Sequence, residues 1–127
     1  MTRQLIAGIG CRRDCHSEAI IRMFEHACQE AGCRASALAA PAFKADEPGL
    51  RLAAQQLGLP LILVEAGALR AVQARCPTRS ARAHGATGFA SVAEGSALAA
   101  AGAGGWLVLA RTTGDGVTCA LAEAAAS

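Results

Sequence analysis

The chain has 127 residues and a net charge of +2, and 32 of its residues are alanine and 14 are glycine. This length predicts one domain over residues 1–127, and the hydrophobic content of 53% excludes a disordered chain. No apolar stretch approaches the roughly 20 residues of a transmembrane helix, and one tryptophan with three phenylalanines leaves little to stack on bases. We therefore expect a cytoplasmic protein with neither a membrane nor a nucleic acid as partner.

Short apolar runs alternate with helical patterns along the first half of the chain. Apolar residues recur with helical spacing between residues 17 and 31, and Gly32 follows where a helix C-cap belongs. The expected elements are a strand at 4–9, a helix at 17–31, a strand at 34–40, a helix at 48–57 and a strand at 61–64.

The second half continues the alternation and ends in two strands. The expected elements are a helix at 66–74, a short strand near 81–83, a helix at 92–101, a strand at 106–110, a turn at 112–116 and a strand at 117–122. A tight turn between two strands indicates an antiparallel hairpin. The sequence therefore predicts a three-layer α/β/α sandwich around a mostly parallel, mixed sheet of about five strands, with an antiparallel C-terminal hairpin.

The segment after the first strand, residues 8–16, is a candidate for binding an anion. In open α/β sheets, ligands bind beyond the carboxyl ends of the strands. Gly8 and Gly10 allow the backbone to approach a ligand, and Arg12 and Arg13 offer bidentate donors to an anionic oxygen. The segment is neither a P-loop nor a dinucleotide fingerprint, and a tight turn with surface arginines explains it equally well.

Three residues of the same loop suggest metal or thiol chemistry. Cys11, Cys15 and His16 lack a second paired cluster, so we expect no metal site, and we expect no cofactor. A reactive thiolate at Cys11 is chemically reasonable, because the neighbouring Arg12 and a helix start favour the ionised thiol. No base for it is identified, although His16 is near in sequence.

Residues 44–50 follow the second expected strand. Lys44 is the one lysine against eleven arginines, which favours a position that uses a compact ammonium group. Glu47 precedes Pro48 at a helix start, where a carboxylate is also favourable for the helix dipole alone.

Gly88, Ser91 and Glu94 belong to a third segment, residues 87–98. Glu94 lies three residues after Ser91, the spacing of a capping box at a helix N-terminus. The alternative is that Glu94 faces the ligand edge of the sheet as an acid.

Basic residues also gather between residues 65 and 94. Arg70, Arg75, Arg79, Arg82 and His84 have no acidic residue among them. This stretch is either a solvated face or a surface that receives a polyanion.

Four segments, taken jointly, match one known family in order and spacing. They are Gly-Ile-Gly-Cys-Arg-Arg at 8–13, Lys-Ala-Asp-Glu-Pro-Gly-Leu at 44–50, Ser-Val-Ala-Glu-x-x-Ala-Leu at 91–98 and Val-Thr-Cys-Ala at 117–120. With them the chain resembles the CobE/CbiG C-terminal-domain family of cobalamin (vitamin B12) biosynthesis. It is most similar to the stand-alone CobE-type members of the aerobic pathway.

The resemblance implies a precorrin-type tetrapyrrole intermediate as ligand, because its rim of carboxylates suits guanidinium groups. We expect an accessory or carrier protein without a catalytic role, with enzymes of the corrin pathway as candidate protein partners. The alternative is a hydrolase that opens a lactone or acyl group at the edge of a (cobalt-)precorrin, with Glu47 or Glu94 as general base. The expected ligand-binding residues are Gly8, Gly10, Cys11, Arg12, Arg13, Lys44, Glu47, Gly88, Ser91 and Glu94.

Overall fold

One five-stranded sheet runs through the structure, a computed structural model that describes residues 4–77 and 91–125. The strands are β1 (Leu5–Cys11), β2 (Ala37–Pro41), β3 (Leu61–Val64), β4 (Trp106–Gly114) and β5 (Val117–Glu123), in the spatial order β3-β2-β1-β5-β4. β1 pairs in parallel with β2, and β2 with β3, whereas β5 is antiparallel to both β1 and β4. The predicted mixed sheet with an antiparallel C-terminal hairpin is confirmed.

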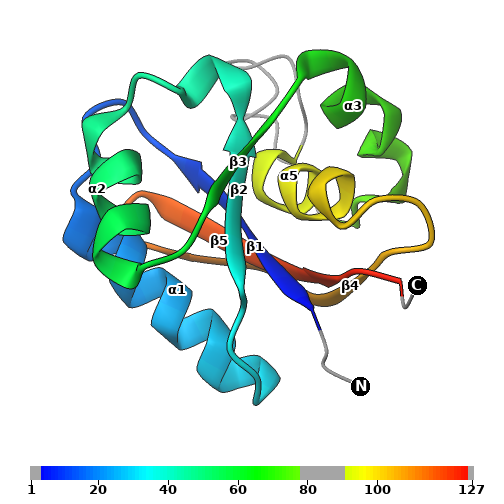
Figure 1. Cartoon of the computed structure of the whole chain (residues 1–127), viewed down its shortest axis with the longest axis horizontal. Helices are drawn as coiled ribbons and strands as arrows, with labels where there is room; N and C mark the ends of the chain where they lie inside the picture. The colour runs from blue at the N-terminus through cyan, green and yellow to red at the C-terminus, as the bar shows by residue number, and fades with distance from the viewer. Residues whose placement is uncertain (1–3, 78–90, 126–127) are drawn as a thin grey trace.

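Helices cover both faces of this sheet (Figure 1). One face carries α1 (Ser17–Ala31) and α2 (Pro48–Leu57), and the other carries α3 (Ala66–Ala71) and α5 (Val92–Ala101). Two short 3₁₀ turns, η1 (Ala42–Lys44) and η2 (Gln73–Arg75), follow β2 and α3. The three-layer α/β/α sandwich is therefore also as predicted.

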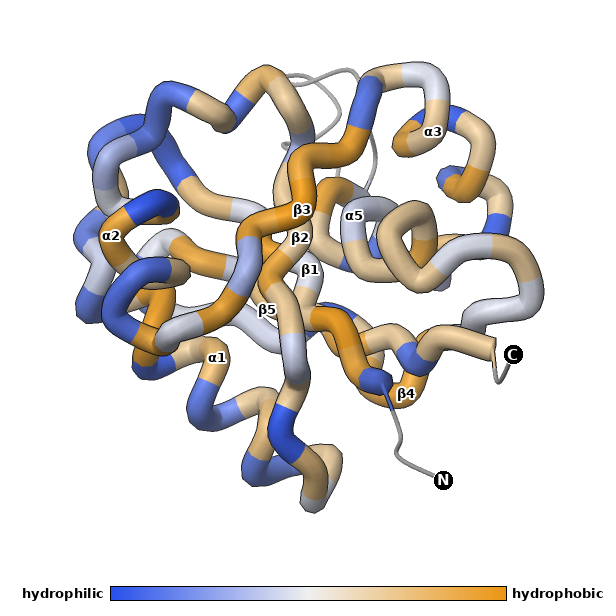
Figure 2. Tube along the Cα trace, in the orientation of Figure 1, coloured by the Kyte–Doolittle hydropathy of each residue, from blue (hydrophilic) through white to orange (hydrophobic). Residues whose placement is uncertain are grey.

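Successive residues of β1 point to opposite layers. Leu5, Ala7 and Ile9 are buried in the core that α1 and α2 cover, whereas Ile6 belongs to the core under α5. The helices differ in character: hydrophilic positions recur along α1 and α2, while the alanine-rich α5 is mostly pale (Figure 2). Small side chains let α5 lie close against the sheet, which accounts for part of the high alanine content.

Three predicted boundaries in the first part of the chain are wrong. β1 does not stop before Gly10 but runs to Cys11, because β5 pairs with both residues. β2 covers Ala37–Pro41 instead of 34–40, and its proline stands at the last position of the strand. α3 ends at Ala71, and the residues that follow form η2 instead of extending the helix to residue 74.

The C-terminal hairpin is longer than predicted. β4 continues to Gly114, because Thr112 and Thr113 pair with β5 instead of joining the turn. The turn itself is reduced to Asp115 and Gly116, whose φ angles of 53° and 77° fit a two-residue hairpin loop. The short strand predicted near residues 81–83 lies outside the described residues.

Within residues 4–77 and 91–125, no helix has both the length and the apolar character needed to cross a membrane.

Candidate functional site

β1, β2 and β3 end at the same edge of the sheet, and the loops that follow β1 and β2 are joined there. The Glu47 carboxylate at the start of α2 accepts a hydrogen bond from the backbone N–H of Asp14, with Oε2 and N 3.0 Å apart. Gly49 approaches the same loop so closely that a Cβ would lie 2.1 Å from the Cys15 carbonyl oxygen. The structure thus brings together two of the segments that the sequence placed at the ligand edge.

The hairpin turn between β4 and β5 completes this edge beside β1. The backbone N–H of Arg12 donates to the Gly116 carbonyl at 3.4 Å. The Arg12 side chain lies across Gly116, where a Cβ would be 3.1 Å from the Arg12 Cδ. The neighbouring Asp115 is paired with Arg22 of α1 at 3.2 Å. Gly116 therefore leaves room for the Arg12 side chain. The Asp-Gly pair in the sequence predicts a turn here, but it does not predict this contact.

Three cationic side chains at this edge have no partner among the described residues. Arg12 and Arg13 are exposed and Lys44 is partly exposed, and none of them forms an ion pair or a side-chain hydrogen bond there. Asp14 and Asp46 are on the same loops, yet neither pairs with these cations. We call Arg12, Arg13 and Lys44 the edge cations; they remain available to an anionic ligand.

An apolar side chain adjoins the edge cations. Phe43, which precedes Lys44 in η1, is 50% exposed. A half-exposed aromatic ring beside a cation suits a ligand with an apolar face and an anionic rim. Phe43 could not be identified from the sequence, because a single phenylalanine forms no pattern that distinguishes a surface position from a core position.

Cys11 lies at the centre of this edge. Its thiol is hydrogen-bonded to Cys15, with Lys44 and Glu47 close enough to act electrostatically. Burial, reinforced by Cys15, raises the pKa of Cys11 to about 12, and this outweighs the opposing effect of Lys44. The structure therefore disfavours a thiolate at Cys11, because the desolvation of the buried thiol has a larger effect on its pKa than the nearby positive charge.

Glu94 is fully buried under the sheet and does not face the ligand edge. Its Oε1 accepts a hydrogen bond from the Ser91 hydroxyl at 2.9 Å, and its Oε2 accepts one from the backbone N–H of Arg111 at 3.0 Å. Arg111 lies where the register between β4 and β5 shifts, so its backbone N–H is not paired with β5 in the regular pattern. The Glu94 carboxylate accepts the hydrogen bond of this N–H instead.

The predicted capping box at the start of α5 does not form. Ser91 is the N-cap residue, but its side chain caps no backbone N–H, since the hydroxyl is turned to Glu94. The backbone of Ser91 is bound instead by the side-chain amide of Gln73. The Gln73 Oε1 accepts a hydrogen bond from the Ser91 N–H at 3.1 Å, and the Gln73 Nε2 donates one to the Ser91 carbonyl at 3.0 Å. No local sequence pattern predicts the role of Gln73, because its contact with Ser91 joins residues 18 positions apart.

The two glycines of β1 serve packing. A Cβ on Gly8 would lie 2.0 Å from the Ala93 carbonyl oxygen of α5, and one on Gly10 would lie 2.4 Å from Thr118 Oγ1 of β5. Both positions therefore need glycine for close approach within the fold, whether or not a ligand is bound. Gly88 lies outside the described residues.

The basic stretch of residues 70–84 is only partly visible. Arg75 donates a hydrogen bond to the carbonyl of Gly105, just before β4 begins, and so lies at the opposite, amino end of the sheet. Arg79, Arg82 and His84 lie outside the described residues. Where the structure describes the chain, no group of three or more His, Cys, Asp or Glu side chains has the arrangement of a metal site.

The fold is that of a known family of small α/β domains. Residues 5–122 match the family described as Cobalamin synthesis G C-terminus, and the chain therefore belongs to this family of cobalamin biosynthesis proteins. The resemblance drawn from the four sequence segments is confirmed.

Individual relatives agree with this assignment. Protein CobE of Sinorhizobium sp. is 33% identical over 121 residues, which cover 93% of this chain and 79% of the relative. A crystal structure of CobE, a protein from the cobalamin biosynthetic pathway, superposes with a TM-score of 0.91 at 37% identity, covering 100% of this chain and 94% of that one. The cobalamin biosynthesis protein chiG of Agrobacterium tumefaciens str. C58 has a TM-score of 0.79 at 40% identity, with 96% and 99% covered.

Proposed function

We propose that the carboxyl edge of the sheet binds a precorrin-type tetrapyrrole intermediate, and that the protein acts as an accessory or carrier in the aerobic pathway. The observation that carries the proposal is the set of edge cations without partners. A tetrapyrrole precursor presents acetate and propionate groups around an apolar ring, and guanidinium groups bind carboxylates in a bidentate way. Phe43 offers an apolar surface for the ring next to Lys44.

Binding is tested by titrating the folded protein with a stable porphyrin that carries eight carboxylates, and by following its absorption band. We expect saturable binding that weakens as salt rises from about 0.02 M to about 0.2 M, because exposed charges are screened over that range. A porphyrin with cationic substituents is the control for charge and should not bind. Absence of a shift with the carboxylate porphyrin, or equal binding of both, would contradict the proposal.

Substitution of the edge cations locates the ligand. The variant with Arg12→Ala, Arg13→Ala and Lys44→Ala should lose at least about a hundredfold in affinity, since charge-assisted hydrogen bonds contribute about 1.5–3 kcal/mol each. Arg34→Ala is the control for each of the three substitutions made singly, because it also removes one exposed positive charge but lies at the other end of the sheet. A loss of affinity in Arg34→Ala equal to that of each single edge variant would mean that net charge alone, and not this edge, attracts the ligand.

Hydrolysis of a lactone or acyl group at the macrocycle's edge is the second candidate function. It is favoured by the position of Glu47, which is partly exposed and close to both Cys11 and Lys44, whereas the buried Glu94 has both oxygens occupied. Glu47 would take a proton from water, and Lys44 would stabilise the oxyanion. Turnover that Glu47→Gln abolishes with binding retained would support a hydrolase; binding without turnover supports a carrier.

A further inference from the structure

Two cysteines flank the backbone that carries Arg12 and Arg13. Cys11 is the last residue of β1, and Cys15 follows after a single turn, closed by a hydrogen bond from its N–H to the Arg12 carbonyl at 3.3 Å. Asp14 adopts a φ of 62° in this turn, which folds the chain back on itself. The two thiols are hydrogen-bonded to each other, and both residues are partly exposed.

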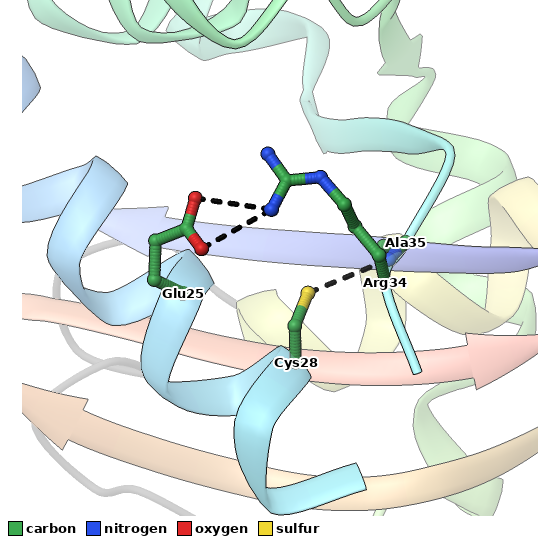
Figure 3. A network of polar contacts seen from close by, with 4 residues as sticks. All are labelled: Glu25, Cys28, Arg34 and Ala35. Atoms are coloured by element: carbon green, nitrogen blue, oxygen red, sulfur yellow. Dashed lines mark hydrogen bonds and ion pairs between the residues drawn. The ribbon is translucent and has the colours of Figure 1, made fainter. Parts of the chain in front are cut away.

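The remaining cysteines have other surroundings. Cys28, Cys76 and Cys119 are buried. Cys28 Sγ accepts a hydrogen bond from the Ala35 N–H at 3.4 Å (Figure 3). Cys33 is partly exposed, but its thiol is directed to the carbonyl of Arg34. Within the described part of the chain, a thiol that is hydrogen-bonded to another thiol and accessible to solvent occurs at Cys11 and Cys15.

We propose that Cys11 and Cys15 form a dithiol that a low-molecular-weight disulfide oxidises to an intramolecular disulfide. Cys15 loses its proton to solvent and attacks one sulfur of the reagent, which releases one thiol and leaves a mixed disulfide on Cys15. Cys11 then loses its proton to solvent and attacks the Cys15 sulfur, which releases the second thiol. Two electrons and two protons thus pass from the protein to the reagent, which becomes two thiols.

The order of the two attacks follows from the surroundings of Cys11. Burial and the neighbouring Cys15 raise the pKa of Cys11 to about 12, so this thiol retains its proton until Cys15 carries the mixed disulfide. The second step needs no encounter in solution, because the two thiols interact across a single turn of the chain.

The disulfide would also regulate binding at the edge, and this part rests on the proposed function. A bond between Cys11 and Cys15 replaces the thiol–thiol contact and fixes the single turn that carries Arg12 and Arg13. The two guanidinium groups would then be held in a different orientation toward the edge. We expect the oxidised protein to bind the carboxylate porphyrin about tenfold more weakly, equivalent to the loss of one charge-assisted contact.

Peptide mapping tests the disulfide directly. The full chain, folded and fully reduced, is incubated with oxidised glutathione, blocked with an alkylating reagent and digested with trypsin. Cleavage after Arg12 and Arg13 separates Cys11 from Cys15, so the disulfide would hold two tryptic peptides together until reduction. We expect this linked pair in the wild type and equally in Cys33→Ser. Trypsin leaves Cys28 and Cys33 together on the peptide of residues 23–34. Separate glutathione adducts without a linked pair, or a disulfide confined to that peptide while Cys11 and Cys15 stay reduced, would overturn the proposal.

Single variants test the order of attack. Cys11→Ser should accumulate the glutathione adduct on Cys15, whereas Cys15→Ser should react with glutathione at most slowly at Cys11. Circular dichroism of each variant shows whether it is folded before the reaction. The reverse pattern, with rapid reaction at Cys11 in Cys15→Ser, would contradict the assigned order.

Porphyrin titration tests the effect of the disulfide on binding separately from the formation of the disulfide. Reduced and oxidised wild type are titrated with the carboxylate porphyrin, and Cys33→Ser is treated in parallel. Equal affinity of both forms would overturn the regulatory part of the proposal. Absence of binding by either form would refute the proposed function and this regulation together, while the linked peptides alone decide whether the disulfide forms.

Discussion

The two ends of the sheet use arginine in opposite ways. At the amino end, the guanidinium of Arg34 binds the carboxylate of Glu25 at 3.1 Å (Figure 3). It also lies over the ring of Phe24, 5.2 Å from the ring centroid. Arg75 donates to the carbonyl of Gly105 at the same end. These arginines connect helices and loops to one another, so their charge and hydrogen-bonding capacity are used within the fold.

At the carboxyl end, the edge cations contact no acidic side chain of the described chain, although Asp14 and Asp46 lie on their own loops. Glu47 also lies at this edge, and one of its carboxylate oxygens is bound to the backbone of Asp14. A charge without a partner contributes little to stability but remains available to bind an anion. Interaction partners, and not residue type, therefore distinguish the arginines that are used within the fold from the cations that remain available to an anion.

The largest effect is expected where a buried acid is removed. Glu94→Ala removes the acceptor of the buried Ser91 hydroxyl and of the partly buried Arg111 N–H, which should cost about 3 kcal/mol of the free energy of unfolding. Urea denaturation measures this loss. Glu47→Ala, at the partly exposed edge, is the matched control, and we expect less than about 1 kcal/mol. Similar losses for both acids would remove the distinction between the interior and the edge.

Alkaline pH probes the interior through Cys119. Burial raises the pKa of this thiol from 9.0 to about 12, so in the folded protein it retains its proton where the unfolded chain loses it. The free energy of unfolding should therefore fall as pH rises above 9, by about 2 kcal/mol at about pH 10.5.

The variant Cys119→Ala isolates this contribution. Urea denaturation at several pH values should give a shallower loss of stability above pH 9 for the variant than for the wild type. A slope should remain, because burial also raises the pKa of Cys11. Parallel curves for the two proteins would show that Cys119 does not keep its proton in the folded state.

A smaller effect is expected for the paired arginine at the amino end. Arg34→Ala removes an ion pair whose side chains are 55% and 49% exposed, together with the contact to Phe24, and should cost about 1 kcal/mol. Thermal or urea unfolding at low and high salt measures it, and the difference from wild type should shrink in high salt. If the loss in free energy of unfolding is the same at low and high salt, the effect comes from packing of the aliphatic part of Arg34 and not from its charge.

Most of the fold could be predicted from the sequence, because its signals are local. Helices at Ser17–Ala31, Pro48–Leu57 and Val92–Ala101 have the predicted bounds, since apolar spacing and a following glycine mark them. The strand ends were missed where the partner strand decides them. Cys11 and Thr112 continue their strands because β5 pairs with them, and no local pattern contains that pairing.

The candidate site could be predicted only in part. The sequence placed Arg12, Arg13, Lys44 and Glu47 at one edge, because loops after parallel strands meet there. It could not show that Glu94 is buried, since a capping box and an acid in the core have the same spacing. Contacts between distant segments, such as Gln73 with Ser91, likewise leave no trace in the local pattern.

The smallest effect on stability, and the most selective effect on binding, is expected at Lys44. Lys44→Met keeps most of the aliphatic stem and removes the ammonium group, which has no ion-pair partner in the described chain, so the free energy of unfolding should change by less than about 0.5 kcal/mol. The affinity for the carboxylate porphyrin should nevertheless fall about tenfold. Measuring the free energy of unfolding and the porphyrin affinity on the same preparation shows whether Lys44 stabilises the fold or binds the ligand. A loss of stability as large as that of Arg34→Ala would mean that Lys44 supports the fold, and the contrast between the two ends of the sheet would then rest on Arg12 and Arg13 alone.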